Sequence, residues 1–180
     1  MIGIPRLMRS ISLNLEGEKG SRRMMEINKD VKVYHKTPIG FLEIAGSEKG
    51  ISNVTFSGTA LNSEDEIPLP LRECVHQIEE YFSGKRKTFS LLLNVQGTDF
   101  QKRVWSELMK IPYGSTVSYK DIAASTGNEK ATRAVGNANG KNRIAIIIPC
   151  HRVIAHNGTL GGFGGGLWRK EWLLNHEKKR

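Results

Sequence analysis

The sequence predicts an α/β amino-terminal domain, followed by a mainly α carboxy-terminal domain that contains a helix-turn-helix. Residues 31–96 carry strand-like patterns around a single amphipathic helix. Residues 97–180 carry capped helical segments instead. The formal charge changes at the same place, from −1 over residues 31–97 to +8 over residues 98–180, within a total of +9. The chain therefore divides near residue 97.

Length and composition restrict the kind of protein this can be. Its 180 residues are 38% hydrophobic and 25% charged, which is typical of a globular protein with one core or two small ones. No apolar run approaches the length of a membrane-spanning helix. Two cysteines make no disulfide framework, so we expect a reducing compartment, the cytoplasm or a eukaryotic nucleus. Residues 1–29 have weak periodicity, and we expect a flexible extension there.

The amino-terminal domain, residues 30–96, is predicted from its alternating segments and turns. We expect four strands, at residues 32–36, 40–45, 51–57 and 87–95. The turn at residues 46–50 is bounded by glycines and predicts a hairpin between the second and third strands. The helix is predicted from apolar residues at helical spacing, namely Leu71, Cys74, Val75, Ile78 and Phe82. No catalytic cluster is visible in this domain.

The carboxy-terminal domain, residues 97–180, opens with a capped helix. Thr98 or Asp99 can accept a hydrogen bond from the free amides of the first helical turn. Its apolar stripe consists of Phe100, Val104, Trp105 and Leu108. The segment Ile-Pro-Tyr-Gly at residues 111–114 ends the helix.

Two short helices joined by a glycine-containing turn follow. Ser118 opens a capping box with Asp121, and that helix stops near Gly127. Asn128 can cap a second helix over residues 129–138. In the basic half of the chain, this pair indicates a helix-turn-helix that binds DNA. The second helix is rich in small residues, which suit close approach either to a DNA groove or to another helix: Ala131, Ala134, Gly136 and Ala138.

Cys150 is the candidate nucleophile. It follows the apolar run at residues 144–148 and directly precedes His151, which could take its proton and leave a reactive thiolate. Such a histidine is usually oriented by a carboxylate, and Glu171 and Glu177 on the last helix are candidates. The alternative is that Cys150 is a small core residue and His151 a structural histidine.

The remaining cysteine and histidines favour no second site. Cys74 lies on the apolar stripe of the amino-terminal helix, where a core position is expected. The other four histidines show no ligand spacing with the cysteines, so no metal site is expected: His35, His76, His156 and His176.

Over roughly residues 97–177, the chain resembles the O6-alkylguanine-DNA alkyltransferases. The matching motifs are Pro149-Cys150-His151-Arg152-Val153-Ile154, Tyr113-Gly114 to Ser118-Tyr119, Ala134-Val135-Gly136 after Arg133, and Lys170-Glu171-Trp172-Leu173-Leu174 to His176-Glu177. The resemblance implies a ribonuclease-H-like fold for residues 31–96, although that half matches only loosely. It also implies single-turnover DNA repair, in which an alkyl group passes from O6-alkylguanine, and from O4-alkylthymine, to the protein's own cysteine. No cofactor is implied.

The resemblance implies a role for each matching residue. Cys150 would accept the alkyl group, and His151 would take the thiol proton through a bound water. Glu177 would orient the imidazole. Asn142 would brace the turn between the second helix and the active site. Tyr119 would crowd the DNA phosphate and donate a proton to the leaving guanine.

The resemblance also implies a DNA-binding mode, in which the second helix enters the minor groove of double-stranded DNA. That groove is only about 6 Å wide, which suits small side chains. Arg133 would fill the gap left when the damaged nucleotide is flipped out of the base stack. The implied DNA contacts are Tyr119, Ala131, Thr132, Arg133, Ala134, Gly136 and Asn137. We expect a monomer that has no contact with membranes.

The pocket wall departs from the family pattern. The implied pocket residues are Val153, Phe163, Gly164 and Asn139. The family commonly has tyrosine followed by serine or alanine where this chain has Phe163 and Gly164, so hydroxyl contacts to the base are lost. Residues 161–166 contain five glycines, and a mobile wall is expected. Asn139 stands where some members have an apolar residue.

Two other functions remain open at this point. A lesion sensor like the alkyltransferase-like proteins would keep the helix-turn-helix but lack the cysteine, and Cys150 argues against it. A helix-turn-helix regulator would need a dimer surface or an effector domain, and neither is evident.

Overall fold

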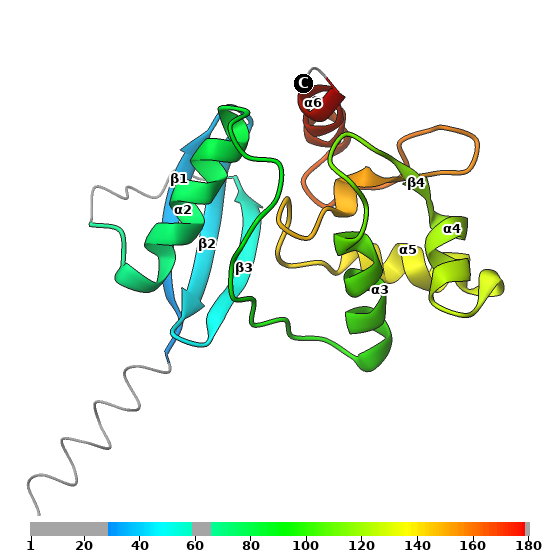
Figure 1. The fold of residues 1–180 in the computed structure, drawn as a ribbon, viewed down its shortest axis with the longest axis horizontal. Coiled ribbons are helices and arrows are strands. Elements are labelled where there is room, and N and C mark those ends of the chain that lie inside the picture. The colour runs from blue at the N-terminus through cyan, green and yellow to red at the C-terminus, as the bar shows by residue number, and fades with distance from the viewer. Residues whose placement is uncertain (1–28, 59–65, 179–180) are drawn as a thin grey trace, which may run out of the picture.

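The computed structural model describes residues 29–58 and 66–178, and almost all of the expected extension at residues 1–29 lies outside them. Along the chain, a sheet with one helix is followed by a unit made mainly of helices (Figure 1). This is the order of fold classes that the sequence predicts.

The first unit is a three-stranded antiparallel sheet covered by one helix (Figure 1). The strands are β1 (Val31–Thr37), β2 (Gly40–Ser47) and β3 (Gly50–Ser57), and the helix is α2 (Leu69–Phe82). The expected hairpin is present, with Ser47 paired to Gly50. Sheet and helix share one buried core that includes Leu42, Ile44, Val54, Leu71, Cys74 and Ile78.

The fourth strand expected at residues 87–95 does not form. This segment meets β3 at a single bridge, between Leu93 and Ile51. Instead of a strand, the Gln77 side chain satisfies the backbone of Ser90: it accepts from the Ser90 amide at 2.9 Å and donates to the Ser90 carbonyl at 3.1 Å. A side chain therefore takes the place of a ladder partner, which the alternation of the sequence could not reveal.

Both predicted helix caps are present in the second unit, and each of them forms a capping box. Thr98, rather than Asp99, caps α3 (Asp99–Met109). Ser118 caps α4 (Tyr119–Ser125), and its amide donates to the Asp121 carboxylate at 2.8 Å.

The second helix of the helix-turn-helix begins later than the sequence suggests. Asn128 accepts from the Lys130 amide at 3.0 Å, but this cap opens the single 3-10 turn η1 (Glu129–Ala131). The α-helix that follows is α5 (Thr132–Gly140). The indole of Trp105 on α3 donates to the Ala138 carbonyl at 2.9 Å, which fixes the end of α5 against α3.

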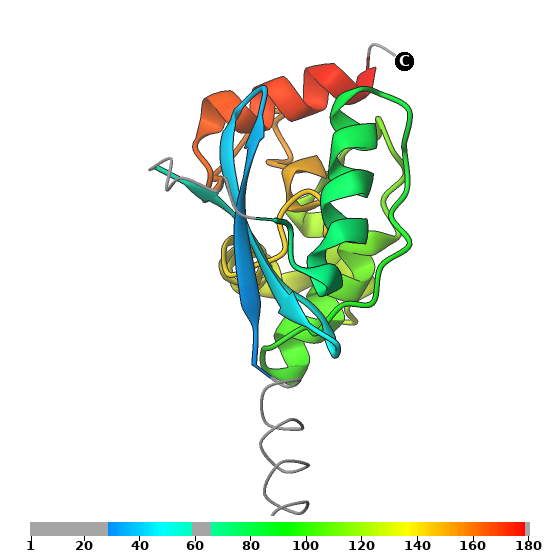
Figure 2. The ribbon, with the colours of Figure 1, turned by 90° about the vertical axis from the view of Figure 1, so that its left-hand side faces the viewer.

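The last part of the chain returns to the first unit. The turn η2 (Cys150–Arg152) leads into β5 (Val153–Ile154), which pairs in parallel with β4 (Val117–Ser118). Helix α6 (Leu167–Lys178) then crosses one end of the molecule, beside α2 and the sheet (Figure 2). Among the described residues, none of the helices has the length and apolar character needed to cross a membrane.

Candidate active site

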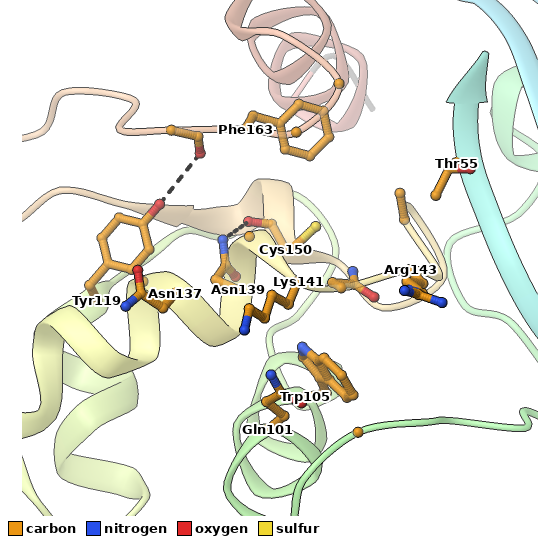
Figure 3. Close-up of a pocket in the computed structure, with 18 of the residues that line it drawn as sticks. Thr55, Gln101, Trp105, Tyr119, Asn137, Asn139, Lys141, Arg143, Cys150 and Phe163 are labelled. Atoms are coloured by element: carbon orange, nitrogen blue, oxygen red, sulfur yellow. Dashed lines mark hydrogen bonds between the residues drawn. The ribbon is translucent and has the colours of Figure 1, made fainter.

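A cavity of about 1080 Å³ lies beside α5, with Cys150 in its wall (Figure 3). Ten of the expected site residues line it: Tyr119, Thr132, Arg133, Gly136, Asn137, Asn139, Asn142, Cys150, Phe163 and Gly164. Thr55 and Phe56 of β3 also contribute to its wall. The first unit therefore forms part of the cavity, which the sequence did not indicate.

The backbone turns sharply before Cys150. Within the apolar run at residues 144–148, the Ile147 amide donates to the Ala145 carbonyl at 2.9 Å. Ile146, at the centre of this turn, has a φ of 72°, a left-handed conformation that is rare for a β-branched residue. Such a conformation costs on the order of 1–3 kcal/mol, and it persists only where the surrounding packing enforces it.

Asn142 connects this turn to the end of α5. Its side-chain amide donates to the Ile148 carbonyl at 2.9 Å, and its side-chain oxygen accepts from the Ile144 amide at 2.9 Å. These two bonds lie across the strained turn, which is the place where the resemblance implies a brace.

The thiol of Cys150 is buried, with 4% of the residue exposed. Burial raises the pKa of the thiol, while hydrogen bonding by Asn142 and the positive charge of Lys170 act in the opposite direction. Lys170 is itself fully buried, and burial lowers the pKa of its amine to about 8. A cation next to the thiol favours the thiolate.

Lys170 also organises the pocket wall. Its ammonium donates to the Val153 carbonyl at 2.6 Å and to the Leu160 carbonyl. Val153 is fully buried and does not line the cavity, so the structure does not bring it to the position expected of a pocket residue. The Cys150 carbonyl also has a partner, because the Asn139 side chain donates to it at 3.3 Å.

His151, the residue after Cys150, is in contact with Glu177. His151 Nε2 lies 2.8 Å from Oε1 of Glu177, and both side chains are completely buried. Burial alone would raise the pKa of Glu177, but hydrogen bonds from His151 and Arg152 outweigh it and bring the pKa down to about 2. Glu177 is thus ionised, and Nε2 carries the proton that it accepts.

The other nitrogen of His151 is then a base. Burial lowers the pKa of the imidazole, although the bond to Glu177 opposes this effect. A neutral ring protonated on Nε2 has its lone pair on Nδ1. Nδ1 is buried and has no hydrogen-bond partner among the described protein atoms. The residue that follows Cys150 therefore has a buried nitrogen that is able to accept a proton.

The Glu177 carboxylate also accepts hydrogen bonds from three other residues. The Arg152 guanidinium binds both carboxylate oxygens, with Nε at 2.9 Å from Oε2 and Nη2 at 3.0 Å from Oε1. The Gly114 amide donates to Oε2 at 3.0 Å, and the Tyr81 hydroxyl donates to Oε1 at 2.9 Å. Glu171, the other candidate for orienting His151, is exposed on α6.

Tyr119 extends over the cavity from the start of α4 (Figure 3). Burial raises the pKa of the Tyr119 phenol, and the charge of Cys150 adds a smaller effect in the same direction. Tyr119 therefore stays protonated and remains a hydrogen-bond donor. Its hydroxyl makes a long hydrogen bond of 3.5 Å to the Gly162 carbonyl.

The expected DNA-contacting residues lie mostly on the outer face of α5. Thr132, Arg133, Ala134 and Asn137 are exposed, whereas Ala131 and Gly136 are half-buried. Within residues 29–58 and 66–178, Arg133 has no carboxylate partner, so its charge is available to an anion.

The glycine-rich wall meets a packing requirement. A Cβ added at Gly165 would lie 2.4 Å from the Phe56 ring and 2.9 Å from the Phe163 ring. At Gly161, where φ is +66°, a Cβ would lie 3.1 Å from the Tyr119 ring. Glycine at these two positions lets the wall approach aromatic rings from both units.

The site residues that sequence reasoning missed are Arg152, Lys170, Tyr81 and Phe56. Arg152 and Lys170 fall inside the matched motifs, and a lysine among the apolar residues of the last helix was a signal that could have been used. Tyr81 and Phe56 belong to the first unit and gave no signal. Groups of three or more potential metal ligands do not occur among the described residues.

Comparison with known proteins gives matches over both units. Residues 99–179 match the family model described as 6-O-methylguanine DNA methyltransferase, DNA binding domain, and residues 31–95 match its ribonuclease-like domain. A methylated-DNA–protein-cysteine methyltransferase from Methanosarcina barkeri is 48% identical over 79% of this chain and 94% of the relative. The constitutive one from Bacillus subtilis is 45% identical over 79% of this chain and 92% of the relative.

Solved structures match as well. The Mycobacterium tuberculosis O6-methylguanine methyltransferase superposes with a TM-score of 0.77 at 42% identity, covering 84% of this chain and 94% of that one. A complex of Mycobacterium tuberculosis OGT with DNA superposes with a TM-score of 0.74 at 44% identity, covering 81% of this chain and 91% of that one.

Proposed function

The chain belongs to the 6-O-methylguanine DNA methyltransferase family, as a DNA repair enzyme that transfers alkyl groups to a cysteine, and we propose that this cysteine is Cys150. The observation that carries the proposal is that the cavity-lining Cys150 directly precedes His151, a buried imidazole held by the carboxylate of Glu177. Cys74, by contrast, is fully buried, and burial raises the pKa of its thiol to about 12.

The transfer begins with loss of the thiol proton. The proton of Cys150 Sγ passes through a bridging water to Nδ1 of His151, which holds the free lone pair. Glu177 stabilises the imidazolium that results, and the ammonium of Lys170 stabilises the thiolate.

The alkyl group then moves in one displacement. Sγ forms a bond to the alkyl carbon, and the bond between that carbon and O6 of guanine breaks, leaving its electron pair on the base. Tyr119 donates a proton to the departing guanine, and the proton held by His151 restores the tyrosine through solvent. The thioether formed on Cys150 is not cleaved at neutral pH, so the thiol is not regenerated and each molecule acts once. The same displacement would serve O4-alkylthymine.

We place α5 in the minor groove of double-stranded DNA. Its exposed face presents small side chains, and the flipped nucleotide would enter the cavity next to it. Arg133 would occupy the space that the nucleotide leaves. One α5 helix and one cavity suffice for this geometry, so a monomer would be the active form.

Cys150→Ser tests the assignment, with Cys74→Ser as its matched control. We expect Cys150→Ser to bind DNA with unchanged affinity but to transfer no methyl group from O6-methylguanine in a duplex. Cys74→Ser should transfer normally and lose only stability. Transfer by Cys150→Ser, or its loss in a folded Cys74→Ser protein, would overturn the assignment.

A further inference from the structure

We propose that Tyr81, from the amino-terminal unit, is a positioning residue of the transfer reaction, whose hydroxyl limits how strongly Glu177 attracts the proton of His151. This inference rests on the proposed function, because it assumes that His151 is the base. Through Tyr81, the amino-terminal unit would influence the proton transfer itself, in addition to forming one side of the cavity.

The geometry of Tyr81 is that of a built contact. Its hydroxyl donates to Oε1 of Glu177 at 2.9 Å, across 96 positions of sequence. The residue is fully buried, and its ring packs against Phe82, Phe89 and Tyr113. His176 Nε2 lies 2.8 Å from the Tyr81 carbonyl, so α6 holds this residue by its backbone as well. The hydroxyl therefore cannot turn away from the carboxylate.

Three donors share one carboxylate oxygen. Oε1 accepts from Nε2 of His151 at 2.8 Å, from Nη2 of Arg152 at 3.0 Å and from the Tyr81 hydroxyl. Each hydrogen bond neutralises part of the negative charge on Oε1, and this reduces the attraction between Oε1 and the other two donors. Burial keeps the pKa of Tyr81 well above its ordinary value, so this hydroxyl is a permanent donor and never a competing anion.

The charged and titratable groups around His151 come from four segments. Glu177 and Lys170 belong to α6, and Arg152 and Cys150 belong to η2 with His151 itself. Tyr81 belongs to α2, and Tyr113 belongs to the segment after α3. Of these, only Glu177 carries a negative charge while Cys150 is protonated. Any change in the charge available on Oε1 therefore acts directly on the imidazole.

Loss of the Tyr81 hydroxyl should raise the pKa of His151. With one donor fewer, Oε1 holds more charge, which stabilises the imidazolium over the neutral ring. Protonated His151 cannot accept the thiol proton, so transfer in the variant should fail at a pH where the parent protein still reacts. Above both pKa values the imidazole is neutral in both proteins, and their rates should converge.

The experiment uses Tyr81→Phe in the full-length protein, with Tyr34→Phe as a matched control. Tyr34 lies in the same unit and donates its hydroxyl to Glu43 at 2.7 Å, away from Glu177. His151 is titrated by NMR of its ring nuclei in unreacted protein, and the second-order rate of methyl transfer is measured from pH 5 to 9. We expect Tyr81→Phe to raise the pKa of His151, and to move the acid limb of the rate upward, by about one pH unit. Tyr34→Phe should change neither.

An unchanged titration of His151 in folded Tyr81→Phe would overturn the proposal, as would an equal loss of rate at every pH. Should that variant not fold, the Tyr81 hydroxyl proton of the parent protein serves instead: its resonance should move as His151 titrates, and a fixed resonance overturns the proposal. The titration does not depend on transfer. A shift of the pKa without a matching shift of the acid limb would therefore show that His151 is not the base, which is a failure of the proposed function.

Discussion

Acid should weaken this protein through Glu177, by an amount that follows from its pKa. The ordinary pKa of the carboxyl is 4.5, and in the folded protein the hydrogen bonds from His151 and Arg152 bring it down to about 2. A pKa that folding lowers contributes stability above the unfolded value, and this stability is lost as the pH falls through the folded value. The window of loss therefore runs from about pH 5 down to pH 2.

The difference of about 2.5 pH units corresponds to about 3 kcal/mol. The carboxylate is completely buried, so solvent does not screen this contribution. Against a total stability of about 5–15 kcal/mol, a loss of this size is easily measured. The assay is urea unfolding, followed by tryptophan fluorescence, at intervals between pH 7 and pH 2.5.

Two variants separate Glu177 from other carboxyl groups. Glu177→Gln should lose about 3–5 kcal/mol at pH 7, because Arg152 is left with an unpaired buried charge, and should show little further loss in the acid window. Asp121→Asn removes an exposed capping carboxylate whose pKa is also lowered, and should keep most of the acid loss. A loss of less than about 1 kcal/mol by the parent protein between pH 5 and pH 2.5 would show that Glu177 does not govern its stability in acid.

Three further predictions concern the cavity and the DNA face. Arg133→Ala should slow repair of duplex DNA at least tenfold more than reaction with free O6-benzylguanine, which needs no flipping; equal losses on the two substrates would contradict the role given to Arg133. Gly165→Ala should slow transfer, because its Cβ would displace the rings of Phe56 and Phe163, whereas Gly162→Ala, with open space around its Cβ, should react normally; similar rates for the two variants would count against a packed wall. Methylation of Cys150 should lower the melting temperature by a few degrees, because the added methyl group over-packs a buried site, at a cost of about 1–3 kcal/mol; an unchanged melting temperature would show that the site accepts the methyl group without strain.

The sequence predicts those features that depend on neighbours along the chain. The helix caps at Thr98 and Ser118 involve amides only three positions away, and the hairpin between β2 and β3 needs only its turn. The helix-turn-helix follows from the same local signals, except that the start of α5 shifts because a 3-10 turn takes the cap of Asn128. Local chemistry is enough for these elements.

The parts that the sequence does not predict depend on contacts between distant segments. Tyr81 reaches Glu177 across 96 positions, and Gln77 replaces a strand partner for Ser90 across 13 positions. Both Glu171 and Glu177 lie on α6, and only the resemblance favoured Glu177 as the partner of His151. The packing of the helix then shows that Glu177 is the buried one. These contacts are set by how the two units pack, and no local pattern encodes that packing.

The role of Cys150 as the alkyl acceptor is tested most directly by locating the transferred group. The protein is mixed with one equivalent of duplex DNA containing O6-methylguanine, and its intact mass and proteolytic peptides are then measured. We expect the mass to rise by a single methyl group, the methyl to be found on Cys150, and a second equivalent of DNA to add nothing. A methyl group on Cys74 or on any other residue, or a mass that never changes while the DNA is repaired, would contradict this role.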